Sequence, residues 1–411
     1  MKRVEKVALY PTRAQERILL FILDVLRQLY NAALEQRREA YRRRGIRVTG
    51  KQQYAELTAL RQEASSLGLR LATVYRECED AVLHRLDLAF AAFFRRLRTG
   101  EKPGFPRFRP HRRWNQIEFP HGNRALRLDA RQTRVIVPGV GAVKLRKGRT
   151  IPLTYGRAWL VRRNDRWYAC FECEREVRPL PAARPLVAVD RGIHVLAALD
   201  DGRLIRNLAV GEKRRRGTAQ LQRALEVVTV RDSAGRVRNG SDPERIAAVK
   251  RLARAKEREA NARRNYAHEK AREIVNGADV IALELLNVRA MTRSAKGTVE
   301  KPGRNVAAKA GLNRRLLDSG FGLLARLIAE KAEGAARRLV WVNPRFSSQE
   351  CSHCEHRAKG SRRRRRFVCV ACGFTAHADV NAALVIRRRA ELPLMSVLSV
   401  GPGPVTQHDA A

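Results

Sequence analysis

Four cysteines near the carboxyl end of the chain have the spacing of a metal site. Cys351 and Cys354 form one C-x-x-C pair, and Cys369 and Cys372 form a second. The two-residue spacer lets both thiolates of a pair face one ion, and two pairs complete a tetrahedral sulfur site. Because four thiolates leave no open coordination position, the pattern predicts a structural zinc, with iron as the competing metal.

Three acidic residues stand at the ends of apolar or helical segments. Asp190 ends the run LVAVD, Glu284 ends VIALE, and Asp379 begins DVNAALVIRRRAEL. Strand ends of one sheet bring such carboxylates together, and two-metal-ion phosphodiester hydrolysis requires a carboxylate cluster around Mg²⁺ or Mn²⁺. The three residues therefore predict a nuclease centre, although acidic residues that merely cap strands remain the alternative.

The chain is strongly basic. It has 411 residues, with 84 Lys and Arg against 41 Asp and Glu, and a formal net charge of +43. An arginine-rich proteome explains part of this excess but not the two-to-one ratio. A polyanionic partner explains it better, because each Lys or Arg placed on a phosphate releases counterions. The charge therefore favours nucleic acid as the partner over a membrane surface.

Two arginine-rich segments are the candidate nucleic-acid contacts. Residues 95–119 interleave arginines with four aromatic residues, which suits a nucleic-acid groove, although the aromatics would equally suit the core of a β domain. The second segment is the arginine run between the two cysteine pairs, for which a solvated loop is the alternative. The predicted contacts are Arg107, Arg109, Arg112, Arg113, Arg362, Arg363, Arg364 and Arg365.

The sequence predicts a prokaryotic cytosolic or nucleoid protein without membrane association. No apolar run approaches the roughly 20 residues that cross a bilayer, and no apolar segment follows the first positive charges. The seven cysteines are then expected to be reduced. Cys170 and Cys173 are also spaced C-x-x-C, but three positions apart on an apparent strand they point to opposite faces. Ordinary buried cysteines are the favoured interpretation there, and a second metal site is the alternative.

The elements that must position these residues fall into two halves. Residues 1–10 predict a strand, and residues 11–98 predict helices that begin with a capping box of Thr12 and Gln15. Later apolar runs, up to about residue 180, predict a small β-barrel or sheet. Residues 185–345 then mix strands and helices in an α/β pattern, with a long basic helix capped by Ser241 or Asp242.

Several motifs together resemble the transposon-encoded TnpB family, which is related to type V CRISPR effectors. The segments LYPTRAQERILLFILDVLRQLYNAAL and GEKPGFPRF resemble the family's opening helix and its G-x-P-x-F segment. VAVDRGIHVLAALDDG and IALELLNVRAM resemble its first two RuvC-like motifs. The most specific match is SSQECSHC through FVCVACGFTAHADVNAALVI, which resembles the zinc ribbon and third motif. Glu355 departs from the family, which usually has glycine at this position.

The resemblance implies an α+β multidomain protein. A helical recognition lobe, a β-barrel wedge domain and an RNase H-like (RuvC) nuclease domain with an inserted zinc ribbon are expected. It places the catalytic, magnesium-binding triad on Asp190, Glu284 and Asp379, and the zinc ligands on the four cysteines. The expected boundaries are residues 1–10 for the first wedge strand, 11–98 for the recognition lobe, 99–182 for the wedge domain, 183–346 for the first two nuclease motifs, 347–375 for the zinc ribbon, 376–391 for the third motif and its helix, and 392–411 for a flexible tail.

The implied activity is RNA-guided cleavage of DNA next to a short recognition motif, by two-metal-ion hydrolysis. The expected partners are a guide RNA from the transposon end and double-stranded target DNA, with a protein monomer on each RNA. Alternatives are a catalytically silent guided repressor, a guide-independent nucleic-acid-binding protein and a RuvC-like resolvase that cuts branched DNA. Retention of all three acids argues against the silent repressor.

Overall fold

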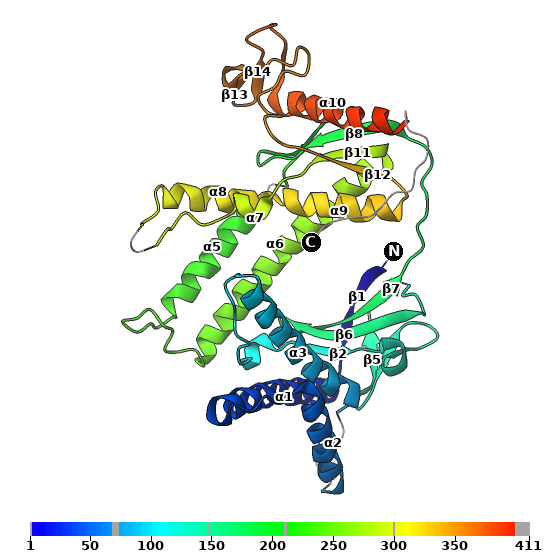
Figure 1. The fold of residues 1–411 in the computed structure, drawn as a ribbon, viewed down its shortest axis with the longest axis vertical. Coiled ribbons are helices and arrows are strands. Elements are labelled where there is room, and N and C mark those ends of the chain that lie inside the picture. Colours follow the sequence, from blue (N-terminus) through cyan, green and yellow to red (C-terminus); the bar gives the residue numbers. More distant parts are fainter. Residues whose placement is uncertain are drawn as a thin grey trace. The chain divides into compact units, whose positions relative to one another are not determined.

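The computed structural model describes residues 2–67, 74–146, 148, 150–208, 212–298 and 301–398. The chain divides into two compact units, Met1–Arg175 and Glu176–Ala411. Each unit contains helices and a β-sheet (Figure 1). Within the described residues, no helix combines the length and apolar character needed to cross a membrane.

Three long helices form the helical part of the first unit: α1 (Arg13–Arg44), α2 (Gly50–Ser66) and α3 (Arg76–Arg98). The predicted capping box forms at the start of α1, where the Thr12 side chain accepts from the Gln15 amide and the Gln15 side chain accepts from the Thr12 amide. Gly45 ends α1 in the left-handed conformation, with φ at 67°. The helices predicted over residues 11–98 are therefore present. The first break in the helical region lies between Gly45, which caps α1, and Gly50, which begins α2.

Seven antiparallel strands form the sheet of the first unit, in the order β2-β6-β7-β1-β5-β4-β3. The N-terminal strand pairs on both sides, so the first residues of the chain lie inside a sheet built from residues 116–174. Among the described strands, no pairing joins β2 to β3, and the predicted closure into a barrel is not shown. The strands are β1 (Lys2–Tyr10), β2 (Gln116–Phe119), β3 (Arg127–Leu128), β4 (Arg134–Val137), β5 (Gly141–Leu145), β6 (Tyr155–Arg163) and β7 (Arg166–Glu174), with the short helix α4 (Gly122–Ala125).

The aromatic residues of the segment 95–119 divide between core and surface. Trp114 and Phe119 are buried in the core that α1 and α3 share with the sheet. Phe105 and Phe108 are 43% and 41% exposed. The core interpretation therefore holds for the first pair, whereas the second pair remains available to a partner.

Five strands form the sheet of the second unit, in the order β10-β9-β8-β11-β12. The pairs β8–β11 and β11–β12 are parallel, whereas β8–β9 and β9–β10 are antiparallel. The chain thus builds one side of the sheet as a meander and crosses over to build the other side. The strands are β8 (Arg184–Asp190), β9 (Val195–Leu199), β10 (Leu204–Arg206), β11 (Ala278–Glu284) and β12 (Arg338–Val342).

Helices cover both faces of this sheet (Figure 1). Leu186 and Ala188 of β8 pack with Ile386 and Ala390 of α10 (Ala378–Leu398). The intervening residues of β8 belong to a second cluster with α6 (Pro243–Asn276) and α9 (Phe321–Gly334). This alternation follows from the two-residue period of a strand, and it sets the face on which each strand-end side chain lies.

The remaining helices of the second unit are α5 (Glu212–Val227), α7 (Val288–Met291) and α8 (Val306–Ser319). Asp242 caps α6 by accepting from the amides of Glu244 and Arg245, which selects Asp242 over Ser241 as the cap. The helix α10 extends through residues 392–398, where the sequence predicted the start of a flexible tail. The rest of the predicted tail, residues 399–411, lies outside the described residues.

A small three-stranded sheet carries the second cysteine pair. Its strands are β13 (Arg362–Arg363), β14 (Arg366–Val368) and β15 (Thr375–His377), and all pairings are antiparallel. The amide of Ala378, the first residue of α10, donates to the carbonyl of Arg365 between β13 and β14. This sheet therefore continues directly into the helix that begins with Asp379.

Candidate catalytic and zinc sites

Two adjacent parallel strands bring Asp190 and Glu284 to the same end of the sheet. Val189 of β8 is in register with Leu283 of β11, and each acid is the next residue of its strand. Strand alternation places both acids on the α10 face, because Ala188 and Ala282, two residues earlier, belong to the core cluster with α10. Asp190 and Glu284 are distant in sequence, but they end adjacent strands at the same level and lie on the same face of the sheet.

The third acid reaches this place from the first turn of α10. Asp379 follows the small sheet at once, and α10 then packs along β8, β9, β11 and β12. Its carboxylate accepts from the guanidinium of Arg362 at 2.8 Å. A carboxylate in the first turn of a helix also benefits from the positive end of the helix dipole.

The pKa of Asp190 depends on the charges of the other two acids. Burial, together with the charges of Glu284 and Asp379, raises the pKa of Asp190 to about 8, although the charges of Arg362 and Arg191 oppose the shift. Burial also raises the pKa of Glu284, against a hydrogen bond from Ser347 and the charge of Arg191. Carboxylates that repel one another in this way are the oxygen donor set that a divalent cation satisfies.

The four cysteines gather more tightly than the three acids. Their sulfur atoms all lie within 4.8 Å of one another, and among the described residues they are the one group of three or more His, Cys, Asp or Glu side chains close enough to share an ion. The three acids are therefore close enough for their charges to interact, but their carboxylate oxygens are not close enough to share one ion.

The sulfur geometry fits zinc. Cys351 Sγ lies 3.8 Å from Cys372 Sγ, and Cys354 Sγ lies 3.5 Å from Cys369 Sγ. Tetrahedral zinc with bonds of about 2.3 Å requires sulfur–sulfur distances of about 3.8 Å. The amide of His353 points to Cys351 Sγ at 3.4 Å, as expected for a knuckle that stabilises a thiolate.

The backbone conformation of the residue after the first C-x-x-C pair explains why glycine suits this position. Glu355 adopts a φ of 63°, and Gly373, the equivalent residue after the second knuckle, adopts a φ of 73°. The left-handed conformation costs an L-residue about 1–2 kcal/mol. The carboxylate of Glu355 lies 3.2 Å from the Arg388 guanidinium.

The predicted arginine contacts have different surroundings. Arg363, Arg364 and Arg365 are exposed in the β13–β14 hairpin, which replaces the predicted loop, whereas Arg362 is half-buried and paired with Asp379. In the first unit, Arg107, Arg112 and Arg113 are exposed. Arg109 is fixed to α1, because its backbone exchanges two hydrogen bonds with the Asn31 side chain.

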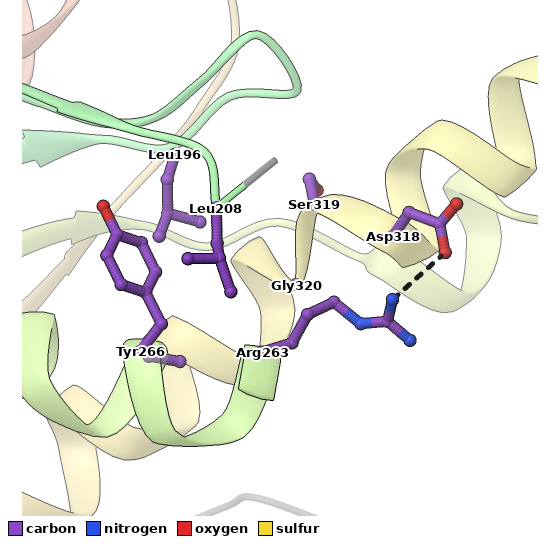
Figure 2. Close-up of a pocket in the computed structure, with 8 residues that line it drawn as sticks. Leu196, Leu208, Arg263, Tyr266, Asp318, Ser319 and Gly320 are labelled. Atoms are coloured by element: carbon purple, nitrogen blue, oxygen red, sulfur yellow. Dashed lines mark ion pairs between the residues drawn. The ribbon is translucent and has the colours of Figure 1, made fainter. Parts of the chain in front are cut away.

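Cys170 and Cys173 are buried in β7 and do not belong to any group of potential metal ligands among the described residues. Their burial agrees with the interpretation as ordinary buried cysteines. Figure 2 shows a pocket elsewhere in the second unit, lined by side chains that include Leu196, Arg263 and Tyr266. Its one acid, Asp318, lies 3.9 Å from Arg263, and none of the predicted catalytic residues lines it.

Two family models match parts of the chain. A family model described as "Cas12f1-like, TNB domain" matches residues 321–386, from α9 into α10. A second, described as "Helix-turn-helix domain", matches residues 1–45. The described part of that second match consists of β1 and the single long helix α1.

Relatives over most of the chain identify the family. The chain is 31% identical over 303 residues to "Putative RNA-guided DNA endonuclease InsQ" of Escherichia coli (strain K12), covering 73% of this chain and 71% of that protein. It is 26% identical over 406 residues to "Putative RNA-guided DNA endonuclease" of Streptomyces pristinaespiralis, covering 93% and 88%. The chain belongs to the TnpB family of transposon-encoded proteins, and the family assignment from the sequence motifs is confirmed.

Similarity to solved structures is weaker. "Structure of the mini-RNA-guided endonuclease CRISPR-Cas_phi3" matches 95% of this chain and 92% of that chain, with 10% identity and a TM-score of 0.48. "Cryo-EM structure of the Cas12f1-sgRNA-target DNA complex" matches 94% and 98%, with 13% identity and a TM-score of 0.30. At these scores the resemblance carries no argument about the site.

The raised pKa of Asp190 makes the stability of the magnesium-free protein fall as pH rises. The folded group, with a pKa of about 8, retains its proton where the unfolded group, near the ordinary pKa of 3.8, has lost it. The native state therefore binds more protons between about pH 4 and pH 8, and the free energy of unfolding decreases over that range. Asp190→Asn removes this loss, so its advantage in melting temperature over wild type should grow from pH 5 to pH 8.

Thermal melts in magnesium-free buffer, without chelator so that zinc is retained, measure this difference. Asp201→Asn is the matched control on the same sheet, because Arg203 and the Arg203 amide lower the pKa of Asp201. Between pH 5 and pH 8 the stability difference between that variant and wild type should be constant, because Asp201 is ionised in both the folded and the unfolded state over this range. An Asp190→Asn difference that is independent of pH would contradict the electrostatic account.

Proposed function

We propose that this chain is an RNA-guided DNA endonuclease whose catalytic acids are Asp190, Glu284 and Asp379. One observation carries the assignment of the acids: strand register, strand alternation and the start of α10 direct all three to one end and one face of the same sheet. Family membership supports the activity, since the two relatives named above are described as RNA-guided DNA endonucleases.

The three carboxylates would hold magnesium or manganese. A divalent ion supplies charge neutralisation at the phosphate and lowers the pKa of a water molecule. The protein's contribution is positional: β8 and β11 fix two carboxylates, α10 fixes the third, and the partial burial of the site would strengthen the attraction between the ionised carboxylates and a divalent ion. Ser347 and Arg362 each hold one of the acids by a direct hydrogen bond.

The five-stranded sheet is proposed to be an RNase H-like, RuvC-type nuclease domain. Its order, with one antiparallel meander beside three parallel strands, and its helices on both faces support this assignment. The four cysteines and β13–β15 would form the zinc ribbon inserted before the third acid. The α1–α3 region would be the recognition lobe, and the seven-stranded sheet would be the wedge domain.

A guide RNA encoded at the transposon end and a double-stranded DNA target are the proposed partners, with one protein copy on each RNA. The β13–β14 hairpin exposes Arg363, Arg364 and Arg365. These arginines lie between the two cysteine pairs and precede Asp379 in the chain. They would hold phosphates beside the acids. Arg107, Arg112 and Arg113 are the candidate contacts of the first unit.

Purification of the full chain after co-expression with its flanking DNA tests the guided part of this proposal. Sequencing of the bound RNA should reveal one discrete species with a constant and a variable segment. The complex should then bind duplex DNA that matches the variable segment, next to a fixed short motif, and should ignore a scrambled duplex. Heterogeneous RNA with no sequence-selective DNA binding would instead indicate a guide-independent nucleic-acid-binding protein.

A further inference from the structure

The loop between β12 and the first cysteine pair reaches back to the catalytic sheet. Ser347 in this loop is 5% exposed, and its hydroxyl donates to Oε1 of Glu284 at 2.5 Å. The Ser347 hydroxyl oxygen also lies 3.1 Å from the carbonyl oxygen of Pro344. Since a hydroxyl has one proton, the shorter contact to the carboxylate takes it.

One arginine of α10 holds the start of this loop. Arg389 donates from Nη1 to the carbonyls of Asn343 and Arg345, at 2.7 and 2.9 Å, and from Nη2 to Glu350 at 2.7 Å. Both carbonyls precede Ser347 by a few residues. The backbone that leads into Ser347 is therefore tied to the same helix that carries Asp379.

The end of the loop is held even more firmly. Glu350 is buried and accepts from Arg357 and Arg388 in addition to Arg389. Asn381, with no exposed surface, donates to the Glu350 carbonyl at 2.7 Å and accepts from the Ser352 amide at 3.0 Å. Both sides of Ser347 are thus clamped onto α10, which leaves its hydroxyl little freedom.

We propose that Ser347 is a positioning residue of the catalytic centre: its clamped hydroxyl fixes the orientation of the Glu284 carboxylate for metal binding. The proposal rests on the function proposed above. Glu284 ends a strand, so its side chain needs an external contact to select one orientation. Groups that hydrogen-bond to metal ligands in this way typically change metal affinity or activity 10- to 100-fold when removed.

Four variants separate this role from simple packing. Ser347→Ala removes the hydroxyl, and Ser347→Thr keeps it. Ser347→Val matches the size of Thr but has no hydroxyl, so the Thr and Val pair isolates the hydrogen bond from volume. Ser348→Ala is the matched control, because Ser348 is the adjacent residue of the same loop and is half-buried.

Manganese binding to the purified full-length chain is the primary measurement, with free Mn²⁺ followed by electron paramagnetic resonance. Ser347→Ala and Ser347→Val should bind Mn²⁺ about 10- to 100-fold more weakly than wild type, with zinc content unchanged. Ser347→Thr and Ser348→Ala should bind as wild type does. If Ser347→Ala fails to fold, the contrast between Thr and Val decides in the same way.

Equal Mn²⁺ affinity in wild type and Ser347→Ala, or in the Thr and Val variants, would overturn the proposal. So would wild-type binding no tighter than that of Asp190→Asn, which lacks one of the acids. The readout does not depend on guide RNA or on cleavage. A failure of the proposed function would appear as absent guided cutting, whereas a failure of the positioning role would appear as a missing contrast in Mn²⁺ binding.

Discussion

Asp190→Ala is expected to reduce target cleavage at least about 1,000-fold, because the loss of a carboxylate that holds the metal removes several kcal/mol of stabilisation from the transition state. Guide RNA binding should persist, since the substitution removes none of the basic side chains of the chain. Cleavage under single-turnover conditions, with the complex in excess over the target and with saturating magnesium, measures the chemical step directly.

The control for this experiment is Asp201→Ala. Asp201 belongs to the same sheet region but pairs with Arg184 and Arg203 rather than with the other acids. This variant should cut at a rate close to that of wild type. Undiminished cutting by Asp190→Ala, with the same bound RNA and the same zinc content, would remove Asp190 from the catalytic centre.

Cys351→Ser is expected to lose the zinc and to unfold the ribbon. Cys351 is completely buried and packs with Phe367, Cys369 and Ala378. The free energy of zinc binding to structural sites is largely free energy of folding, on the order of 10 kcal/mol. Because Ala378 begins α10, loss of the ribbon should also free the acid that follows it. We therefore expect zinc content near zero, a lower melting temperature and lost cleavage.

Zinc per chain by mass spectrometry and the thermal melt are the two readouts. Cys173→Ser, a buried cysteine of the first unit outside the four-cysteine group, is the control that should retain full zinc. A Cys351→Ser protein that lacks zinc but melts and cuts as wild type does would refute the structural role of the metal.

The sequence was sufficient to predict the candidate sites because their signals are local. The two C-x-x-C pairs are close together in the chain, and the structure brings their sulfur atoms within reach of one ion. Asp190 and Glu284 each follow an apolar run, and the rule that parallel strands end at one edge was enough to expect them together. The catalytic roles themselves remain a proposal.

The contacts that orient the acids could not be predicted in the same way. Ser347 and Glu284 are 63 residues apart, and their meeting depends on the path of the loop after β12. Arg362 appeared to be one of a run of nucleic-acid contacts, yet its half-buried position pairs it with Asp379. Composition shows that a chain is basic, but only tertiary structure shows which arginines are already paired.

Some sequence patterns fit two different structural environments, so the sequence alone does not choose between them. Interleaved aromatic and arginine residues suit either a core or a groove, and the structure assigns Trp114 and Phe119 to the core while leaving Phe105 and Phe108 exposed. Similarly, alternating short strands predict a sheet, but closure into a barrel depends on pairing between the terminal strands. Neither question is decided by hydrophobic periodicity.

Guide-dependent cleavage is the most direct test of the central claim. The complex of the chain with its co-purified RNA would be mixed in magnesium with a plasmid library that carries the matching target and randomised flanks. The account predicts cutting only of plasmids with the matching target and one short flanking motif, and no cutting when the guide segment is scrambled. Cutting that ignores the guide, or selective binding without any cutting in magnesium or manganese, would contradict it.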